Sequence, residues 1–233
     1  MSVTEAPSSK KETIQGFFDS IAPSYDGINK VLSLNLDESW RKKSRDLIYS
    51  PEQKTILDLG VGTGKFISLF LEKKKWETAV GLDFSIGMLR CGKESLKNAI
   101  QWVSGDFHHL PFQNDSFDAV ISSYTLRSVQ EMPKFFGELR RVLRANGKAG
   151  LLCLTRPRNW FWRMMSYPYL KFFLPFVGGT LSGNRKAYEF LSSSILTFQE
   201  PQKTADMLKQ QGFQEVQIIS FSFGLATLII ARK

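Results

Sequence analysis

The chain has 233 residues, of which 42% are hydrophobic and 23% charged, a composition that suits one folded domain with a substantial core. It lacks an apolar run of about 18 residues, which excludes a transmembrane helix. Two adjacent histidines argue against a histidine-rich metal site, and two cysteines favour a reducing, cytoplasmic compartment. The formal charge of +9 suits nucleic acid or an anionic membrane, although we weight a soluble enzyme with a basic surface above either.

The predicted elements alternate between strands and helices along most of the chain. Residues 1–12 are polar and predict a flexible leader, and 13–49 predict a series of helices. Strands are predicted at 55–59, 78–83, 101–104, 117–123, 147–154, 214–220 and 223–231, and helices at 64–74, 85–97, 131–144 and 201–211. Asn146-Gly147 predicts a turn before strand 147–154. This alternation predicts an α/β fold, a doubly wound, mostly parallel seven-stranded sheet with an antiparallel C-terminal strand.

A glycine-rich stretch, "ILDLGVGTGK", follows the first predicted strand and opens the first helix after it. A P-loop is excluded because its first glycine would fall on Leu59, and the third glycine comes one residue early for a dinucleotide fingerprint. What remains is Asp-x-Gly-x-Gly-x-Gly, the pattern of S-adenosylmethionine (SAM) methyltransferases, which this sequence resembles. The candidate SAM-binding residues here are Asp58, Gly60, Gly62, Thr63 and Gly64.

Three further strand ends point to the same pocket, because ligands of such sheets bind outside the carboxyl ends of the strands. Asp83 ends the second strand, where a carboxylate accepts ribose hydroxyls. Asp106 follows the third strand and could accept from the adenine amino group, with Phe107 beside the ring. Ser123 ends the fourth strand. Each of these residues alone could be a turn or a helix cap, but together they favour one nucleoside site.

A narrower resemblance covers the chain from about residue 16 to its end. The stretches "FFDSIAPSYDGINKVLSLNLDESWRKK", "LPFQNDSFDAVISSYTLRSV" and "YPYLKFFLPFVGGTLSGNRKAYEFLSSSILTF" resemble, in order, blocks of the quinone-biosynthesis C-methyltransferases, the UbiE/MenG family. The resemblance implies SAM-dependent methylation of a ring carbon on a polyprenylated hydroquinone, of the demethylmenaquinol type. SAM is an activated donor, so the implied reaction requires no metal.

The resemblance implies two catalytic residues. It also implies one methyltransferase domain at 13–233, which contains an N-terminal lid and an insertion. Tyr25 lies in a predicted helical lid (13–49), and Arg127 follows the fourth strand, where a cation could stabilise a phenolate. His108 and His109 are weaker candidates for a base. The aromatic-rich insertion (156–198) could form a channel for the prenyl tail, contact an anionic membrane at its cytoplasmic face, or simply pack as a helical cap.

Departures from the family pattern lie on the acceptor side. The family's Phe-Gly-Leu-Arg-Asn appears as "YTLRS" (124–128), its "YLPES" as "FLSSS" (190–194), and its final Gly-Gly pair as Phe223-Gly224. Three alternatives therefore stay open: a methyltransferase for another lipid-like or small phenolic acceptor, a noncatalytic SAM-binding subunit of a quinone-synthesis complex, and a nucleic-acid methyltransferase, which we favour least. A homodimer also stays open.

Overall fold

The computed structural model describes the backbone of residues 7–233 and the side chains from Glu12 onward. The helices are α1 (Pro7–Ile21), α2 (Tyr25–Leu32), α3 (Leu36–Ile48), α4 (Lys65–Leu71), α5 (Ile86–Leu96), α6 (Met132–Val142), α7 (Trp160–Pro168), α8 (Leu174–Ser182), α9 (Arg185–Thr197) and α10 (Pro201–Gln210), with a π-helical segment at Tyr169–Phe173. The strands are β1 (Thr55–Leu59), β2 (Thr78–Asp83), β3 (Gln101–Ser104), β4 (Phe117–Ser123), β5 (Leu143–Leu154), β6 (Gln214–Phe221) and β7 (Ala226–Arg232).

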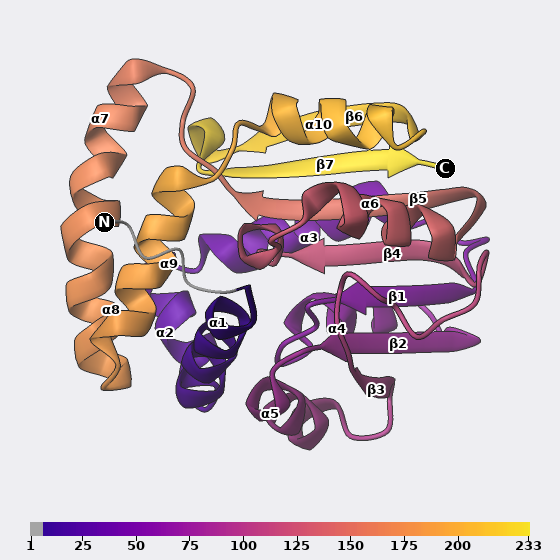
Figure 1. Ribbon diagram of the computed structural model, residues 1–233, viewed down its shortest axis with the longest axis horizontal. Coiled ribbons are helices and arrows are strands. Elements are labelled where there is room, and N and C mark those ends of the chain that lie inside the picture. Colours follow the sequence, from indigo (N-terminus) through magenta and orange to yellow (C-terminus); the bar gives the residue numbers. More distant parts are fainter. Residues whose placement is uncertain (1–6) are drawn as a thin grey trace.

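The strands form one seven-stranded sheet in the order β3-β2-β1-β4-β5-β7-β6. Neighbouring strands from β3 to β5 are parallel, and β7 pairs antiparallel with both β5 and β6. The chain order reverses between β1 and β4, and in such sheets the reversal opens a crevice beyond the carboxyl ends of the strands. Helices α1, α2, α8 and α9 lie beyond the end to which the arrowhead of β4 points (Figure 1).

Helices cover both faces of the sheet because its central strands are apolar on both sides; every residue of β1 is buried. One face packs on α6 and α10 through Phe135, Phe136, Leu139 and Leu208. The other packs on α3 and α4 through side chains that include Ile48, Phe66 and Phe70. A third cluster joins α1 and α2 to α8 and α9, so the helical cap beyond the strand ends has a core of its own.

The predicted doubly wound, mostly parallel sheet is confirmed, and the first four strands keep their predicted bounds. Three local predictions were wrong. The strand predicted at 223–231 begins at Ala226, because Ser222–Gly224 form a 3-10 turn. Residues 7–12 of the expected leader are helical, whereas 1–6 lie outside the described residues. The turn at Asn146-Gly147 does not separate α6 from β5, because β5 already begins at Leu143. Asn146 has a positive φ of 62° within β5, where the pairing with β4 is irregular.

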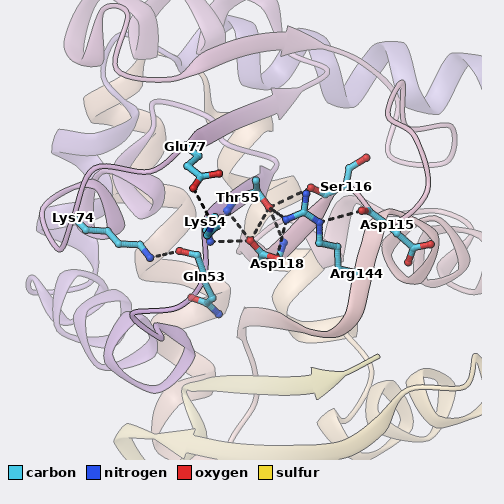
Figure 2. Close-up of polar contacts among 9 residues, drawn as sticks. All are labelled: Gln53, Lys54, Thr55, Lys74, Glu77, Asp115, Ser116, Asp118 and Arg144. Carbon is cyan, nitrogen blue, oxygen red and sulfur yellow. Dashed lines mark hydrogen bonds and ion pairs between the residues drawn. The ribbon is translucent and has the colours of Figure 1, made fainter.

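A polar network fixes the opposite edge of the sheet, where the central strands begin (Figure 2). The Asp118 carboxylate accepts from the backbone N–H of Lys54 at 2.7 Å and of Thr55 at 2.9 Å, and from the Thr55 hydroxyl at 3.0 Å. It also pairs with Arg144 at 3.0 Å. These charge-assisted bonds join the starts of β1, β4 and β5, so the register that aligns their carboxyl ends is set from the far edge.

Candidate functional site

A cavity opens over the glycine-rich turn at the carboxyl ends of β1, β2 and β4, and we call it the glycine-loop cavity. Eight of the predicted site residues line it: Tyr25, Gly60, Gly62, Thr63, Asp83, Phe107, Ser123 and Arg127. Asp58, Gly64 and Asp106 are not among its lining residues. The turn after β1 therefore brings together residues that are up to about a hundred positions apart in the sequence.

The three glycines of the turn differ in what they make possible. All have positive φ, which favours glycine. A Cβ on Gly60 would lie 2.1 Å from the Thr125 hydroxyl, and one on Gly64 would lie 2.5 Å from the Leu96 side chain. A Cβ on Gly62 would meet no protein atom within 4 Å. Gly60 and Gly64 thus serve packing, whereas Gly62 leaves open space for a ligand against the backbone.

Asp83 organises this turn from the end of β2. Its Oδ2 accepts from the N–H of Gly62 at 2.8 Å, and its Oδ1 accepts from the N–H of Ser85 at 2.9 Å. Burial raises the pKa of Asp83 to about 6, although the N–H groups of Ser85 and Gly62 favour the carboxylate. Each carboxylate oxygen has a second lone pair, so Asp83 retains the capacity to accept hydroxyl donors from a ligand.

Asp58 lies behind the turn and is 1% exposed. Neither of its carboxyl oxygens has a hydrogen bond of normal length and angle within the described part of the chain. Burial and then the Asp83 carboxylate raise the pKa of Asp58 to about 8, and Arg41 opposes the rise. A buried acceptor in this state suits a cationic donor, and a positively charged ammonium group supplies one.

Asp106 faces a neighbouring cavity, lined also by His108 and His109, and Phe107 lies on the wall between the two. His108 is held by structural contacts. Its Nδ1 lies 2.8 Å from Asp106 Oδ1, and its Nε2 accepts from the N–H of Glu131 at 3.3 Å. Neither histidine lines the glycine-loop cavity, so the histidines lie beside Asp106 and Phe107 but not beside the residues of the glycine turn.

The contribution of α3 was not predicted from the sequence. Arg41 is 8% exposed and pairs with Asp37 at 2.6 Å. Its guanidinium lies 4.9 Å from the centre of the Tyr124 ring. Burial alone lowers the pKa of Arg41, but Tyr124 and Asp37 outweigh it and the pKa is raised. The i,i+4 spacing of Asp37 and Arg41 was the available signal, although spacing alone does not reveal burial.

A second, larger cavity adjoins the first, and we call it the apolar cavity. Its volume is about 360 Å³, within the range of small-molecule sites. It lies among α2, α3, α7, α9, the π-helical segment and the turn between β6 and β7. Its lining residues include Leu32, Leu36, Trp40, Leu154, Trp162, Met165, Leu170, Leu174, Leu191, Ile195 and Phe223. Tyr25, Tyr124 and Arg127 line both cavities and therefore form the boundary between them.

Arg127 is a cation without a carboxylate partner at this boundary. It donates to the Ser194 hydroxyl at 3.1 Å and shares a hydrogen bond with the Tyr25 side chain. Its Nε is buried without a partner, and no ion pair to Arg127 forms among residues 12–233. Burial lowers the pKa of Arg127, but an arginine keeps its charge in proteins. An anionic ligand group at this boundary would therefore be stabilised.

The sheet order, the glycine turn and the family match given below together define the class: the protein is a SAM-dependent methyltransferase of the doubly wound type. A solved SAM-dependent methyltransferase from Thermotoga maritima, described as a possible histamine N-methyltransferase, has the same fold. It aligns with a TM-score of 0.67 at 18% identity, over 94% of this chain and 99% of that one. A likeness at that identity concerns the fold alone.

The chain belongs to the ubiE/COQ5 methyltransferase family, whose model matches residues 6–233. It is 36% identical to the demethylmenaquinone methyltransferase of Thermotoga maritima over 222 residues, 94% of this chain and 96% of that protein. It is also 36% identical to the ubiquinone/menaquinone biosynthesis C-methyltransferase UbiE of Campylobacter jejuni, over 96% of this chain and 99% of that protein. SAM is accordingly its methyl donor.

The raised pKa of Asp58 predicts a pH-dependent loss of stability in the ligand-free protein. A carboxyl group whose folded pKa exceeds its unfolded value stabilises fully below the unfolded pKa, about 4, and this contribution is lost as the pH rises through about 8. We expect Asp58→Asn to gain stability relative to wild type by on the order of a few kcal/mol between pH 5 and pH 8.5. Thermal melts at both pH values measure this difference.

Glu77→Gln is the matched control, because Glu77 is an exposed carboxylate at the opposite edge of the sheet (Figure 2). Its stability relative to wild type should change little between the two pH values. An Asp58→Asn difference that stays constant across this pH range would contradict the burial of an unpaired Asp58 carboxyl group.

Proposed function

We propose that this chain methylates a ring carbon of a polyprenylated hydroquinone, of the demethylmenaquinol type. The observation that carries the proposal is the apolar cavity, which meets the glycine-loop cavity at Tyr25, Tyr124 and Arg127. A donor in one cavity and an apolar acceptor in the other would meet at this boundary. The names of the relatives from Thermotoga maritima and Campylobacter jejuni support a quinone-type acceptor.

For the donor, we propose that Asp83 accepts the ribose hydroxyls and that Asp58 faces the ammonium group, directly or through water. Gly60, Gly62, Thr63 and Gly64 form the turn around the methionine portion, Phe107 and Ser123 complete the wall, and Asp106 approaches the adenine edge. The open space at Gly62 and the unpaired Asp58 carboxyl group both fit a nucleoside with a cationic tail.

The N-terminal helices form the proposed lid of a single domain, 13–233. Thr63 donates to Asp26 of α2 at 2.9 Å. Ser85 and the N–H of Gly87 both donate to Asp19 of α1, at 2.6 and 2.8 Å. These bonds tie α1 and α2 to the turns after β1 and β2, so the helices that carry Tyr25 are fixed relative to the donor site.

In the proposed reaction, SAM supplies the methyl group of its sulfonium to the acceptor. The bond between the sulfur and the methyl carbon breaks, and the sulfur retains both electrons of that bond. The acceptor must lose a hydroxyl proton, because phenolate character makes the ring carbon nucleophilic, and the ring proton leaves after the new carbon–carbon bond forms. The unpaired Arg127 guanidinium stabilises the phenolate oxygen, and the Tyr25 hydroxyl orients Arg127 and the acceptor. The remaining rate enhancement comes from alignment of the ring carbon with the methyl group.

Methyl transfer from labelled SAM tests the acceptor class. We expect label on the ring of a reduced, short-tailed demethylmenaquinone, with less transfer to a benzoquinol of equal tail length. Mass analysis of the product locates the label. Transfer to other lipid phenols but not to quinols would keep the methyltransferase and reject the quinone acceptor. SAM binding by calorimetry without transfer to any acceptor would favour a noncatalytic subunit.

Arg127 variants separate acceptor activation from donor binding. We expect Arg127→Met to lower kcat by roughly 10²-fold, because one preorganised donor to an oxyanion is lost. Arg127→Lys should recover part of this activity, and Tyr25→Phe should lose about tenfold. Calorimetry should give a SAM Kd within about threefold of wild type. A loss of SAM affinity that parallels the loss of kcat would instead place Arg127 in donor binding.

We also propose that the insertion contacts the surface of an anionic membrane. Helix α7 has apolar side chains but buries none of its residues; Trp160 is 71% exposed and Met165 58%. Phe172 and Phe176 are exposed in the following segment. Residues 156–188 contain six arginines and lysines but no Asp or Glu, and of these six only Arg185 has an ion pair in the described residues, with Glu189 at 2.9 Å. Apolar area beside unopposed positive charge suits a lipid surface with anionic headgroups. No helix within residues 7–233 is long and apolar enough to span a bilayer.

Vesicle flotation tests this contact. We expect the protein to float with vesicles containing anionic phosphatidylglycerol but not with neutral phosphatidylcholine alone, and Trp160→Ala combined with Arg163→Glu to abolish flotation. Lys42→Glu, at an exposed position of α3, is the control and should float as wild type does. If flotation fails and sedimentation shows a dimer that the double variant disrupts, the same face is a homodimer contact instead.

A further inference from the structure

The mouth of the apolar cavity is marked by lining side chains that also reach solvent. Leu34 is 83% exposed, Phe223 69% and Trp162 38%, and all three line the cavity. Tyr124 and Leu174, which line the same cavity, are buried at 7% and 5%. A ligand whose ring reaches the boundary with the glycine-loop cavity therefore extends outward past Leu34, Trp162 and Phe223.

Phe223 occupies this mouth in an unfavourable backbone conformation. It has φ 58° and ψ 21°, and Ser222 before it has φ 45°. The left-handed region favours glycine, and a bulky side chain there is rarely found without a reason. Ser222 and Phe223 lie together in the turn between β6 and β7, so the contacts of this turn must hold Phe223 in place.

Three hydrogen bonds hold the turn on both sides of Phe223. Trp40 Nε1 donates to the Ser222 hydroxyl at 3.0 Å. The Thr155 hydroxyl donates to the Gly224 carbonyl at 2.8 Å, and the Thr155 N–H donates to the Leu225 carbonyl at 3.0 Å. These bonds fix the Phe223 backbone against the end of β5, so the ring has a defined direction toward α7.

The Phe223 ring stacks on Trp162 of α7, with centroids 4.2 Å apart and planes 12° from parallel. The pair joins two segments that are about sixty residues apart and presents a rigid aromatic wall at the cavity mouth. Such a wall gains contact with a flexible apolar chain without losing side-chain freedom of its own. The strained conformation of the turn places the Phe223 ring where it forms this wall with Trp162.

We propose that Phe223, positioned on Trp162, determines acceptor specificity by contacting the first isoprene units of the tail as they leave the apolar cavity. This inference rests on the proposed function for the identity of the acceptor ring. It adds the residue that distinguishes a prenylated acceptor from the bare ring. The methyl-transfer step itself does not involve Phe223, which lines the apolar cavity but not the glycine-loop cavity, whereas Arg127 lines both.

The test compares two acceptors with the same naphthohydroquinone ring, one bearing two isoprene units and one bearing none, assayed in detergent without lipid. For Phe223→Ala we expect KM for the tailed acceptor to rise about tenfold, with kcat and the KM for the bare ring within about twofold. Phe223→Gly should show the same kinetics but melt a few degrees higher than Phe223→Ala, because glycine relieves the left-handed strain. Similar kinetics at different stability separate specificity from folding.

Phe176→Ala is the control, since Phe176 is 67% exposed in the same insertion but does not line the cavity. It should leave both KM values unchanged. A tailed-acceptor KM that stays within twofold in Phe223→Ala, or one that rises equally for both acceptors, would overturn the inference.

A measurement of quinone binding distinguishes a failure of this inference from a failure of the proposed reaction. The oxidised tailed quinone should quench the tryptophan fluorescence of the wild-type protein, since Trp40 and Trp162 line the cavity. A weaker Kd in Phe223→Ala, with no turnover in any variant, would keep the specificity role and reject the reaction. Equal Kd values in wild type and Phe223→Ala would reject the specificity role.

Discussion

The site depends on how buried charge is divided beyond the carboxyl ends of the strands. Two carboxyl groups, Asp83 at the glycine-rich turn and Asp58 behind it, are buried, and burial raises the pKa of both. Arg127 lies at the boundary with the apolar cavity and has no carboxylate partner in the described residues, whereas Arg41 lines the glycine-loop cavity and pairs with Asp37. A buried ionised group without an ion pair, as Arg127 is and as Asp58 is once deprotonated, is costly unless a ligand compensates it. A cationic donor on one side and a developing phenolate on the other would compensate both.

The sheet makes this division possible because it places each group from a different strand or helix. Asp58 and Asp83 end neighbouring parallel strands, paired in register as far as Leu59 and Leu82. Arg127 follows β4 on the other side of β1. The close approach of Thr125 to Gly60 presses the turn after β4 against the turn after β1. A change in either turn therefore alters the distance between donor and acceptor sites.

The sequence predicted those features of the fold that local residue patterns determine. The first four strands were located to the residue because apolar runs alternate there with glycine and capping signals, and the donor loop followed from its spacing. The sequence could not predict the burial of Arg41, which depends on Tyr124 after the end of β4, or the helices of the insertion. In the insertion, aromatic side chains are abundant on every face, so no single period marks the buried one. The position of Phe223 could not be predicted either, because phenylalanine disfavours a positive φ. The hydrogen bonds from Trp40 and Thr155 to the turn impose this conformation.

The departures from the family pattern are scattered in the sequence but converge in space. Block 124–128 carries Tyr124 and Arg127 at the boundary of the two cavities. Block 190–194 contacts Arg127 through Ser194 at 3.1 Å. Phe223 stands at the mouth of the same apolar cavity. The donor loop, in contrast, retains every residue of its pattern. These changes therefore gather around the apolar cavity, which the proposed acceptor would occupy, and not around the glycine-rich turn.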